Sequence, residues 1–276
     1  MAYKTIATRW LLSQKNAFNI SFVEHKWNIN LFSSITDIEI KIQLDHKTVI
    51  NGRGTDQIGD LALEKASSEA IERWCCHKLK ISSVGCAVHS NEICANSNSK
   101  KEFIERYFFN QFLDYKIKPQ KIKNYKTKEL SEHLIIRYPS AQICFWEISK
   151  SLSGTILLCL IYDNNKTISL GLACEDNHDL GIQKSTIEAI RNFVAYKTDP
   201  HAFIFIIKNN PDFWCCNPTL LNRLASQLEL APADAVPEIV LQDPEVVTKS
   251  YKVSELLNLQ DCPLYFSETK TLRALI

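Results

Sequence analysis

The sequence lacks a C-x-x-C pair, although ten cysteines occur among its 276 residues. Structural zinc sites usually draw their thiolates from such closely spaced pairs, so we expect no such site here. The seven histidines are scattered without the spacing of metal ligands, and we expect none of them to bind a metal. Cys75-Cys76 follows a stretch with the pattern of a packed helix, which favours buried, inert thiols over a nucleophile.

A strong net charge, a membrane-length apolar run and a signal peptide are also missing. The net charge is +1, so we expect neither a nucleic-acid partner nor a membrane partner. The longest apolar runs, such as residues 154–162, have the length of a strand and are too short to span a bilayer. Residues 1–15 are too polar for a signal peptide and contain no small-residue cleavage site. These features predict a cytoplasmic protein with reduced thiols.

The chain has enough apolar residues for a substantial core. Hydrophobic residues make up 45% of the sequence, which suits a globular protein of one large or two small domains. We expect a core domain over residues 1–210, with residues 211–276 as a proline-rich extension of short helices and loops packed on it. The lysine-rich run 116–128 is interpreted as a solvated connector, with a phosphate- or acidic-peptide-binding surface as the alternative.

Two segments share one charged signature. Residues 69–73 read Glu-Ala-Ile-Glu-Arg and residues 102–106 read Glu-Phe-Ile-Glu-Arg, and a weaker third version lies at residues 184–188. Carboxylates at positions i and i+3 share one face of a helix. Two such helices that face each other would gather four carboxylates and two guanidiniums. A protein core does not tolerate that charge without compensation, whereas a magnesium–nucleotide site requires it.

Each signature follows a segment with the pattern of a strand and a glycine. Residues 38–44 alternate as a half-buried strand, turn at Asn51–Gly54 and lead into a helix. Residues 82–88 resemble a strand interrupted by glycine, and Asn98 or Ser99 offers an N-cap for the second helix. The apolar positions expected on the two helices are Leu61, Leu63, Ala66, Ala70 and Ile71, and Phe103, Ile104, Phe108 and Phe109.

The third segment is predicted as three strands and a helix. The strands cover residues 141–148, 155–162 and 167–173, and a helix opens at residues 176–179 and runs to about Tyr196. A short strand is expected at residues 202–207. The predicted fold class is therefore α+β, with repeated strand–glycine turn–helix segments whose helices pack on mixed or antiparallel sheets.

These segments resemble the YcaO family, over roughly residues 38–200. The residues that carry the resemblance are Gly52-Arg53-Gly54 with Glu69, Glu72 and Arg73; Gly85-Cys86-Ala87 with Glu102, Glu105 and Arg106; and Gly171 with Lys184 and Glu188. The resemblance implies a YcaO-like fold and an enzyme that uses ATP and Mg²⁺ to activate backbone amides of a ribosomally made peptide. The chemistry implied is cyclodehydration of Cys, Ser or Thr to an azoline, or formation of a thioamide or amidine.

The resemblance also implies roles for individual residues. It implies magnesium ligands at Glu69, Glu72, Glu102 and Glu105, and a nucleotide cradle completed by Arg53, Arg73, Arg106, Lys184 and Glu188. Catalytic roles would fall to Glu72, Glu105 and Arg106. The expected partners are a precursor peptide and a separate leader-peptide-binding protein or second subunit. Substrate peptide, nucleophile and oligomeric state are not specified by the sequence.

The sequence departs from the family pattern at several positions. Cys94 stands where the family usually has a glutamate, Lys65 stands for a small hydroxyl residue, and Lys184 stands for an arginine, which loses bidentate geometry. The C-terminus also lacks a proline-rich ending. These departures motivate an alternative, a non-catalytic YcaO-like subunit that scaffolds a peptide-modifying complex. A further alternative is an unrelated α+β domain whose signatures are solvated helix faces, with Lys184 and Glu188 as an ordinary i,i+4 pair.

Overall fold

The computed structural model describes residues 6–24, 35–114, 116–122, 134–164, 166–198, 218–229 and 240–272. The chain divides into two compact units, one of residues 1–103 and 244–276 and one of residues 104–243. This division differs from the boundary expected after residue 210. The strand expected at residues 202–207 and the end of the lysine-rich run, residues 123–128, lie outside the described residues.

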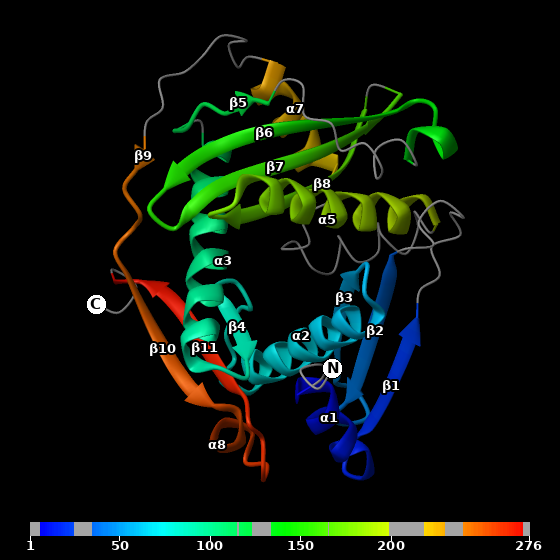
Figure 1. Cartoon of the computed structure of the whole chain (residues 1–276), viewed down its shortest axis with the longest axis vertical. Coiled ribbons are helices and arrows are strands. Elements are labelled where there is room, and N and C mark those ends of the chain that lie inside the picture. Colours follow the sequence, from blue (N-terminus) through cyan, green and yellow to red (C-terminus); the bar gives the residue numbers. More distant parts are fainter. Residues whose placement is uncertain are drawn as a thin grey trace. The chain divides into compact units, whose positions relative to one another are not determined.

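The first unit contains two antiparallel sheets of three strands (Figure 1). One sheet has the order β1 (Asn19–Glu24), β2 (Thr36–Gln43) and β3 (Val49–Asp56), which confirms the strand predicted at residues 38–44. The other has the order β10 (Val246–Lys252), β11 (Tyr265–Thr271) and β4 (Cys86–His89). The helices of this unit are α1 (Ile6–Ser13), the 3₁₀ turn η1 (Gln14–Asn16), α2 (Gly59–Leu79), the first part of α3 (Glu92–Leu113) and α8 (Val253–Leu257).

Strands β10 and β11 correct the expectation of helices and loops in the C-terminal part. Ser267, Glu268 and Thr269 of the central strand β11 are buried. A hydroxyl side chain of α3 contacts this strand, because Ser99 Oγ and Thr269 Oγ1 lie within hydrogen-bonding distance at 2.7 Å. Because three of its four buried residues are polar, the strand shows no alternation of apolar and polar positions, and it was not recognised in the sequence.

Helix α2 packs through small residues. Ala62, Ala66 and Ala70 are fully buried, whereas Leu61, which was expected on the apolar face, is 38% exposed. The small side chains allow the helix backbone to approach the sheet closely. Trp74, near the C-terminal end of the helix, is buried in the same core. The core of the first unit therefore combines a close helix–strand contact with larger side chains around it.

Helix α3 begins earlier than expected. It starts at Glu92, and the side chain of Asn91 accepts the N–H of Cys94 at 3.2 Å, as an N-cap does. Ser99 lies inside the helix, where its hydroxyl donates to the carbonyl oxygen of Gly85 at 2.7 Å. The N-cap expected at Asn98 or Ser99 is therefore wrong, because Ser99 bonds a neighbouring segment and not its own helix.

The second unit is built around one sheet. Its strands β5 (Gln120–Lys121), β6 (Ala141–Ser151), β7 (Gly154–Asp163) and β8 (Lys166–Glu175) are antiparallel neighbours in that order, and β9 (Val240–Leu241) pairs with β6 in parallel. The three long strands confirm the predictions for residues 141–173. Its longer described helices are α5 (His178–Thr198), α7 (Pro218–Glu229) and the second part of α3.

Helices cover both faces of this sheet. Ile156, Leu158 and Leu160 of β7 belong to a core that includes apolar residues of α3 and α7, such as Phe108 and Leu224. The alternate residues of β7 face α5, where Gly181 lies next to Leu157. Burial on both faces explains why β7 is almost continuously apolar. The α+β class with helices packed on antiparallel sheets is confirmed, and no described helix has the length and apolar character needed to cross a membrane.

Candidate functional site

The glycines of the G-x-G segment lie inside strand β3, which corrects the expected turn at Asn51–Gly54. A Cβ atom on Gly52 would overlap the backbone of Ala66 and Ala70, and one on Gly54 would overlap that of Ala62 and Ala66. Glycine is therefore required by the close approach of α2 and not by a turn. The turn between β2 and β3 instead uses Asp45, whose side chain accepts the N–H groups of Lys47 and Thr48 at 2.8 Å.

The second unit repeats this approach at Gly171. A Cβ atom there would overlap the backbone of Ser185 and Ala189 on α5. The contacted residues lie fourteen and eighteen positions after the glycine, the same offsets that join Gly52 to α2. The strand–helix pairs β3–α2 and β8–α5 are thus built alike. Gly85, by contrast, has a φ of 72° and precedes β4 in a turn, so it serves partly as a turn glycine.

Glu69 is hydrogen-bonded to the strand that precedes its helix. Its Oε2 accepts the N–H of Arg53 at 2.7 Å, and its Oε1 lies 2.5 Å from the Arg73 guanidinium. Arg73 in turn donates to the carbonyl oxygen of Asn51 at 3.2 Å. Strand β3 is at the end of its sheet, so these side chains satisfy backbone groups on its outer edge.

Glu188 makes the equivalent hydrogen bond in the second unit. It accepts the N–H of Leu172 at 2.8 Å, and Asn192 donates to the carbonyl oxygen of Leu170 at 3.1 Å. Strand β8 is also at the end of its sheet. In both units, the residue seventeen positions after the glycine accepts from the strand and the residue twenty-one positions after it donates to the strand. This arrangement was missed from the sequence, because only the offset from the glycine signals it.

Two lysines occupy a further equivalent position, thirteen residues after the glycine. Lys65 Nζ lies 2.7 Å from Asp56, and Lys184 forms an ion pair with Glu175. The two acidic partners each lie four residues after their glycine, at the end of their strand. Lys65 and Lys184, both departures from the family pattern, therefore make the same strand–helix contact.

Three carboxylates of the signature share the first unit. Burial raises the pKa of Glu72 well above its usual range, and the neighbouring carboxylates of Glu102 and Glu69 raise it further. Arg73 offsets only part of this effect. Carboxylates that repel one another in a half-buried place gain from a bound cation, and oxygen ligands of this type suit Mg²⁺.

A second acidic group lies in the second unit. Burial raises the pKa of Glu105 to about 7, and the charges of Glu188 and Glu175 act in the same direction. Arg106, with its Nε 3.6 Å from Glu105, and the N–H of Cys174 oppose the shift. The side chain of Glu105 is only 12% exposed. Glu102 and Glu105 lie one turn apart on α3, which contributes to both units.

Arg53 is engaged elsewhere. Its guanidinium donates to the fully buried carboxylate of Asp37, with Nε 3.0 Å from Oδ1 and Nη2 2.5 Å from Oδ2. Thr55 donates to the same carboxylate at 3.0 Å. Asp37 was not recognised in the sequence, because it belongs to no motif and directly precedes the strand predicted at residues 38–44. The Arg53 side chain therefore holds β2 and β3 together.

Within the described part of the chain, no three His, Cys, Asp or Glu residues gather closely enough to hold a metal ion by themselves. The donor chemistry and the crowding of charge fit Mg²⁺, whose usual shell also includes water and phosphate oxygens. Cys75 and Cys76 are buried, and burial raises the pKa of Cys75, so this pair has the character of inert thiols. Cys94 is exposed near the start of α3.

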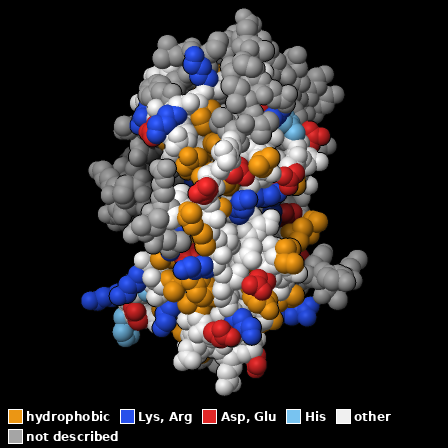
Figure 2. Space-filling model, turned by 90° about the vertical axis from the view of Figure 1, so that its left-hand side faces the viewer, with side chains coloured by type: hydrophobic (Ala, Val, Ile, Leu, Met, Phe, Trp, Pro, Cys, Tyr) orange, Lys and Arg blue, Asp and Glu red, His pale blue; other side chains and the backbone are white. Residues whose placement is uncertain are grey.

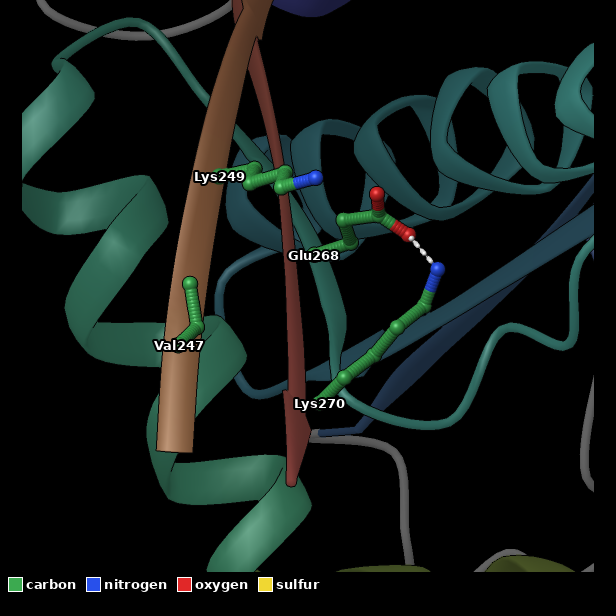
Figure 3. Close-up of a pocket in the computed structure, with 4 residues that line it drawn as sticks. All are labelled: Val247, Lys249, Glu268 and Lys270. Atoms are coloured by element: carbon green, nitrogen blue, oxygen red, sulfur yellow. Dashed lines mark ion pairs between the residues drawn. The ribbon is translucent and has the colours of Figure 1, made fainter. Parts of the chain in front are cut away.

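Two hollows lie in the first unit. One is lined by Val247, Lys249, Glu268 and Lys270 and has a volume of about 10 Å³, which is room for a single water (Figure 3). Both oxygens of Glu268 are held there, by Lys270 at 2.7 Å and by the Tyr251 hydroxyl at 3.0 Å. The other, of about 230 Å³, shares Glu268 and Lys270 and is lined mostly by apolar atoms.

The face of the molecule that carries β10 shows no single charged patch among its described side chains. Basic, acidic and hydrophobic side chains are interspersed on it (Figure 2).

No family model matches the sequence, and no curated protein matches it either. The fold, in contrast, matches solved structures. YcaO from Methanopyrus kandleri, bound with AMPPCP and Mg²⁺, superposes with a TM-score of 0.66 over 95% of this chain and 88% of that one, at 8% identity. The E. coli microcin synthetase McbBCD complex with pro-MccB17 bound gives 0.60 over 91% and 87%, at 11% identity. A heterocyclase in complex with substrate and cofactor gives 0.59 over 96% and 52%, at 9% identity.

These similarities confirm the fold that the three segments predicted. They do so although the sequence identities are at most 11% for these structures. The chain has the fold of the YcaO proteins.

Proposed function

We propose that this protein binds ATP with Mg²⁺ and activates backbone amides of a ribosomally synthesised precursor peptide. The observation that carries the proposal is the burial of Glu72 and Glu105 beside other carboxylates, at equivalent positions of the two E-x-x-E-R helices, which raises the pKa of both carboxyl groups. Each is a carboxylate held among other carboxylates, in a fold shared with a YcaO that binds AMPPCP and Mg²⁺. An apolar core gains nothing from such a group, whereas a site for a cation and a triphosphate does.

Different residues would bind the metal ion and the phosphate groups. Glu72, Glu102 and Glu105 would supply oxygen ligands to Mg²⁺, which when bound offsets the charge of the phosphates. Arg106 would contact phosphate oxygens. Glu69, Arg73, Lys184 and Glu188 would complete the cradle, and their contacts with β3 and β8 would fix the orientation of the two helices.

The reaction proposed is amide activation by phosphoryl transfer. A Cys, Ser or Thr side chain of the peptide adds to the preceding amide carbon, and the former amide oxygen attacks the γ-phosphorus while ADP leaves. Loss of phosphate with formation of the C=N bond then gives the azoline. Positioned cations and carboxylates suit this chemistry, because phosphoryl transfer depends mainly on orientation and charge stabilisation. An external sulfide or amine would give a thioamide or amidine in the same way.

A partner is part of the proposal. The similar microcin synthetase structure is a complex that holds pro-MccB17. We propose that the present chain likewise receives its precursor peptide through a leader-binding partner or second subunit. The cysteines in the described part of the chain are free thiols, which suits the cytoplasm, where such complexes would have access to ATP.

The alternative is a non-catalytic YcaO-like subunit. Glu69 and Glu188 already accept backbone N–H groups, Arg53 is held by Asp37, and Cys94 replaces a glutamate expected from the family. These contacts would stabilise a scaffold equally well. A scaffold would bind the peptide or a catalytic partner and would have no affinity for Mg-ATP.

Calorimetry with Mg-ATP separates the two functions. The proposed enzyme should bind the nucleotide, and Glu72→Gln and Glu105→Gln should weaken binding at least tenfold and abolish ATP consumption in the presence of peptide and partner. Glu255→Gln, at a residue 73% exposed on α8, is a matched control and should behave as the wild type. Absence of heat with the wild type, or unchanged ATP consumption by the two variants, would contradict the proposal.

A further inference from the structure

The three strand–helix segments can be aligned on their glycines. Gly52, Gly85 and Gly171 are each followed by a glutamate seventeen residues later, which is Glu69, Glu102 or Glu188. Twenty residues after the glycines stand Glu72, Glu105 and Arg191. The third segment therefore places a cation where the first two place an anion.

The alignment of the first and third segments is structural and not only numerical. The glycine contacts, the glutamate that accepts from the strand, the residue that donates to it and the lysine–acid pair occur at the same offsets in β3–α2 and β8–α5. Equivalent offsets on equivalently packed helices point side chains in equivalent directions. Arg191 thus projects from its helix as Glu72 projects from α2.

Arg191 also shares a neighbour with Glu105. Its Nη2 lies 3.9 Å from Oε1 of Glu188, and its side chain is 25% exposed. Glu188 is at the same time a charged neighbour of Glu105. Glu105 and Arg191, which both stand twenty residues after their glycines, therefore share Glu188 as a charged neighbour. The ion pair of Arg191 with Glu188 explains why these two side chains lie 3.9 Å apart. It does not explain why Arg191 stands at the same distance from its glycine as Glu72 and Glu105 do.

We propose that Arg191 binds the phosphate groups of the nucleotide, as the anion-binding counterpart of Glu72 and Glu105. This inference rests on the proposed function. A carboxylate at this offset suits a cation, and a guanidinium suits phosphate oxygens, which it can bind in a bidentate manner. A magnesium–triphosphate complex presents both kinds of charge. The sequence signature ended at Glu188 and so did not include this residue.

The test uses Arg191→Ala and Arg191→Lys in the full chain. Calorimetry would measure the affinities for Mg-ATP and for AMP. Arg191→Ala should weaken Mg-ATP binding at least tenfold and change AMP binding less than threefold, because the side chain acts on the outer phosphates. Arg191→Lys should recover part of the loss, since it retains the charge but not the fork. Thermal unfolding would establish that each variant is folded. If Arg191→Ala does not fold, Arg191→Gln would take its place in the measurements.

Arg223→Ala is the matched control. Arg223 is another guanidinium of the second unit, on α7, with its side chain 46% exposed near Asp114. The Arg223→Ala variant should bind Mg-ATP and AMP with the affinities of the wild type. Wild-type affinity for Mg-ATP in Arg191→Ala, or an equal loss for ATP and AMP, would overturn the inference and leave the proposed function standing. Absence of nucleotide binding in the wild type would overturn both.

Discussion

The carboxylate of Glu69 accepts the backbone N–H of Arg53 at 2.7 Å and so ties helix α2 to the outer edge of strand β3. Glu188 does the same for Leu172 on β8 at 2.8 Å. The first glutamate of the signature thus has a structural partner, while Glu72 and Glu105 gain raised pKa values from burial and from neighbouring carboxylates. The two glutamates of one signature, Glu69 and Glu72, therefore have different surroundings in the structure.

Alanine at either of these positions should destabilise the protein. Glu69→Ala and Glu188→Ala each remove the acceptor of a backbone N–H, at a cost of about 1–3 kcal/mol in the free energy of unfolding. Glutamine should cost less, because its amide oxygen can accept the same hydrogen. Urea denaturation would measure the changes, with Glu255→Ala as a control expected to stay within about 0.5 kcal/mol. Equal stability of the alanine variants and the control would show that these bonds contribute nothing.

The glycines of β3 and β8 should tolerate no side chain. A Cβ atom on Gly52 or Gly171 would overlap helix backbone, so alanine should cost more than about 3 kcal/mol or prevent folding. Gly59 provides the contrast, because a Cβ atom there would lie 3.5 Å from Thr36 Oγ1, an ordinary contact. Gly59→Ala should be neutral or stabilise by up to about 1 kcal/mol. Similar melting temperatures for Gly52→Ala and Gly59→Ala would exclude the close approach.

Periodicity and composition predicted the regular elements well. Strands β2, β7 and β8 and helix α5 were recognisable in the sequence because most of their buried positions are apolar. Strand β11 could not be predicted in this way, since its buried centre is Ser267, Glu268 and Thr269. The position of Gly52 and Gly54 inside a strand was missed for a related reason. Their requirement arises from a helix that packs on them and not from the local chain.

The signature glutamates were found from their spacing, but their different surroundings were not. A helix pattern shows that Glu69 and Glu72 share a face, yet it does not show that a strand N–H lies beside one of them. Asp37 was missed because it belongs to no motif and precedes the predicted strand at residues 38–44. The constant offsets from the glycines can be counted in the sequence alone. They become meaningful once β3–α2 and β8–α5 are seen to make the same contacts.

The stability of the protein without bound cation should fall as the pH rises through 7. Burial raises the pKa of Glu105 to about 7, above the value of about 4.3 in an unfolded chain. A carboxyl group with a raised pKa favours the folded state only while protonated, so its contribution is lost as the pH rises between these values. Above pH 7 the loss is on the order of 3 kcal/mol. The raised pKa of Glu72 acts in the same direction.

Glu105→Gln isolates this effect. The variant is neutral at every pH, so it should be more stable than the wild type at pH 8, and the difference should shrink steadily as the pH falls to 5. Urea denaturation at several pH values in the absence of divalent ions would measure it. Addition of Mg²⁺ at pH 8 should then stabilise the wild type more than the variant. A difference in stability that does not vary with pH would contradict the role of this titration.

The buried pair of Asp37 and Arg53 should be strongly coupled. Arg53→Ala leaves the fully buried Asp37 carboxylate without its guanidinium, which should cost about 3–5 kcal/mol. Asp37→Ala should also destabilise, and the double variant should lose less than the sum of the two, because neither charge is then left alone. A double-mutant cycle by urea denaturation would give the coupling free energy, and strictly additive losses would contradict a direct interaction. Since this pair holds β2 to β3, Arg53→Lys should lower stability while changing the affinity for Mg-ATP less than threefold.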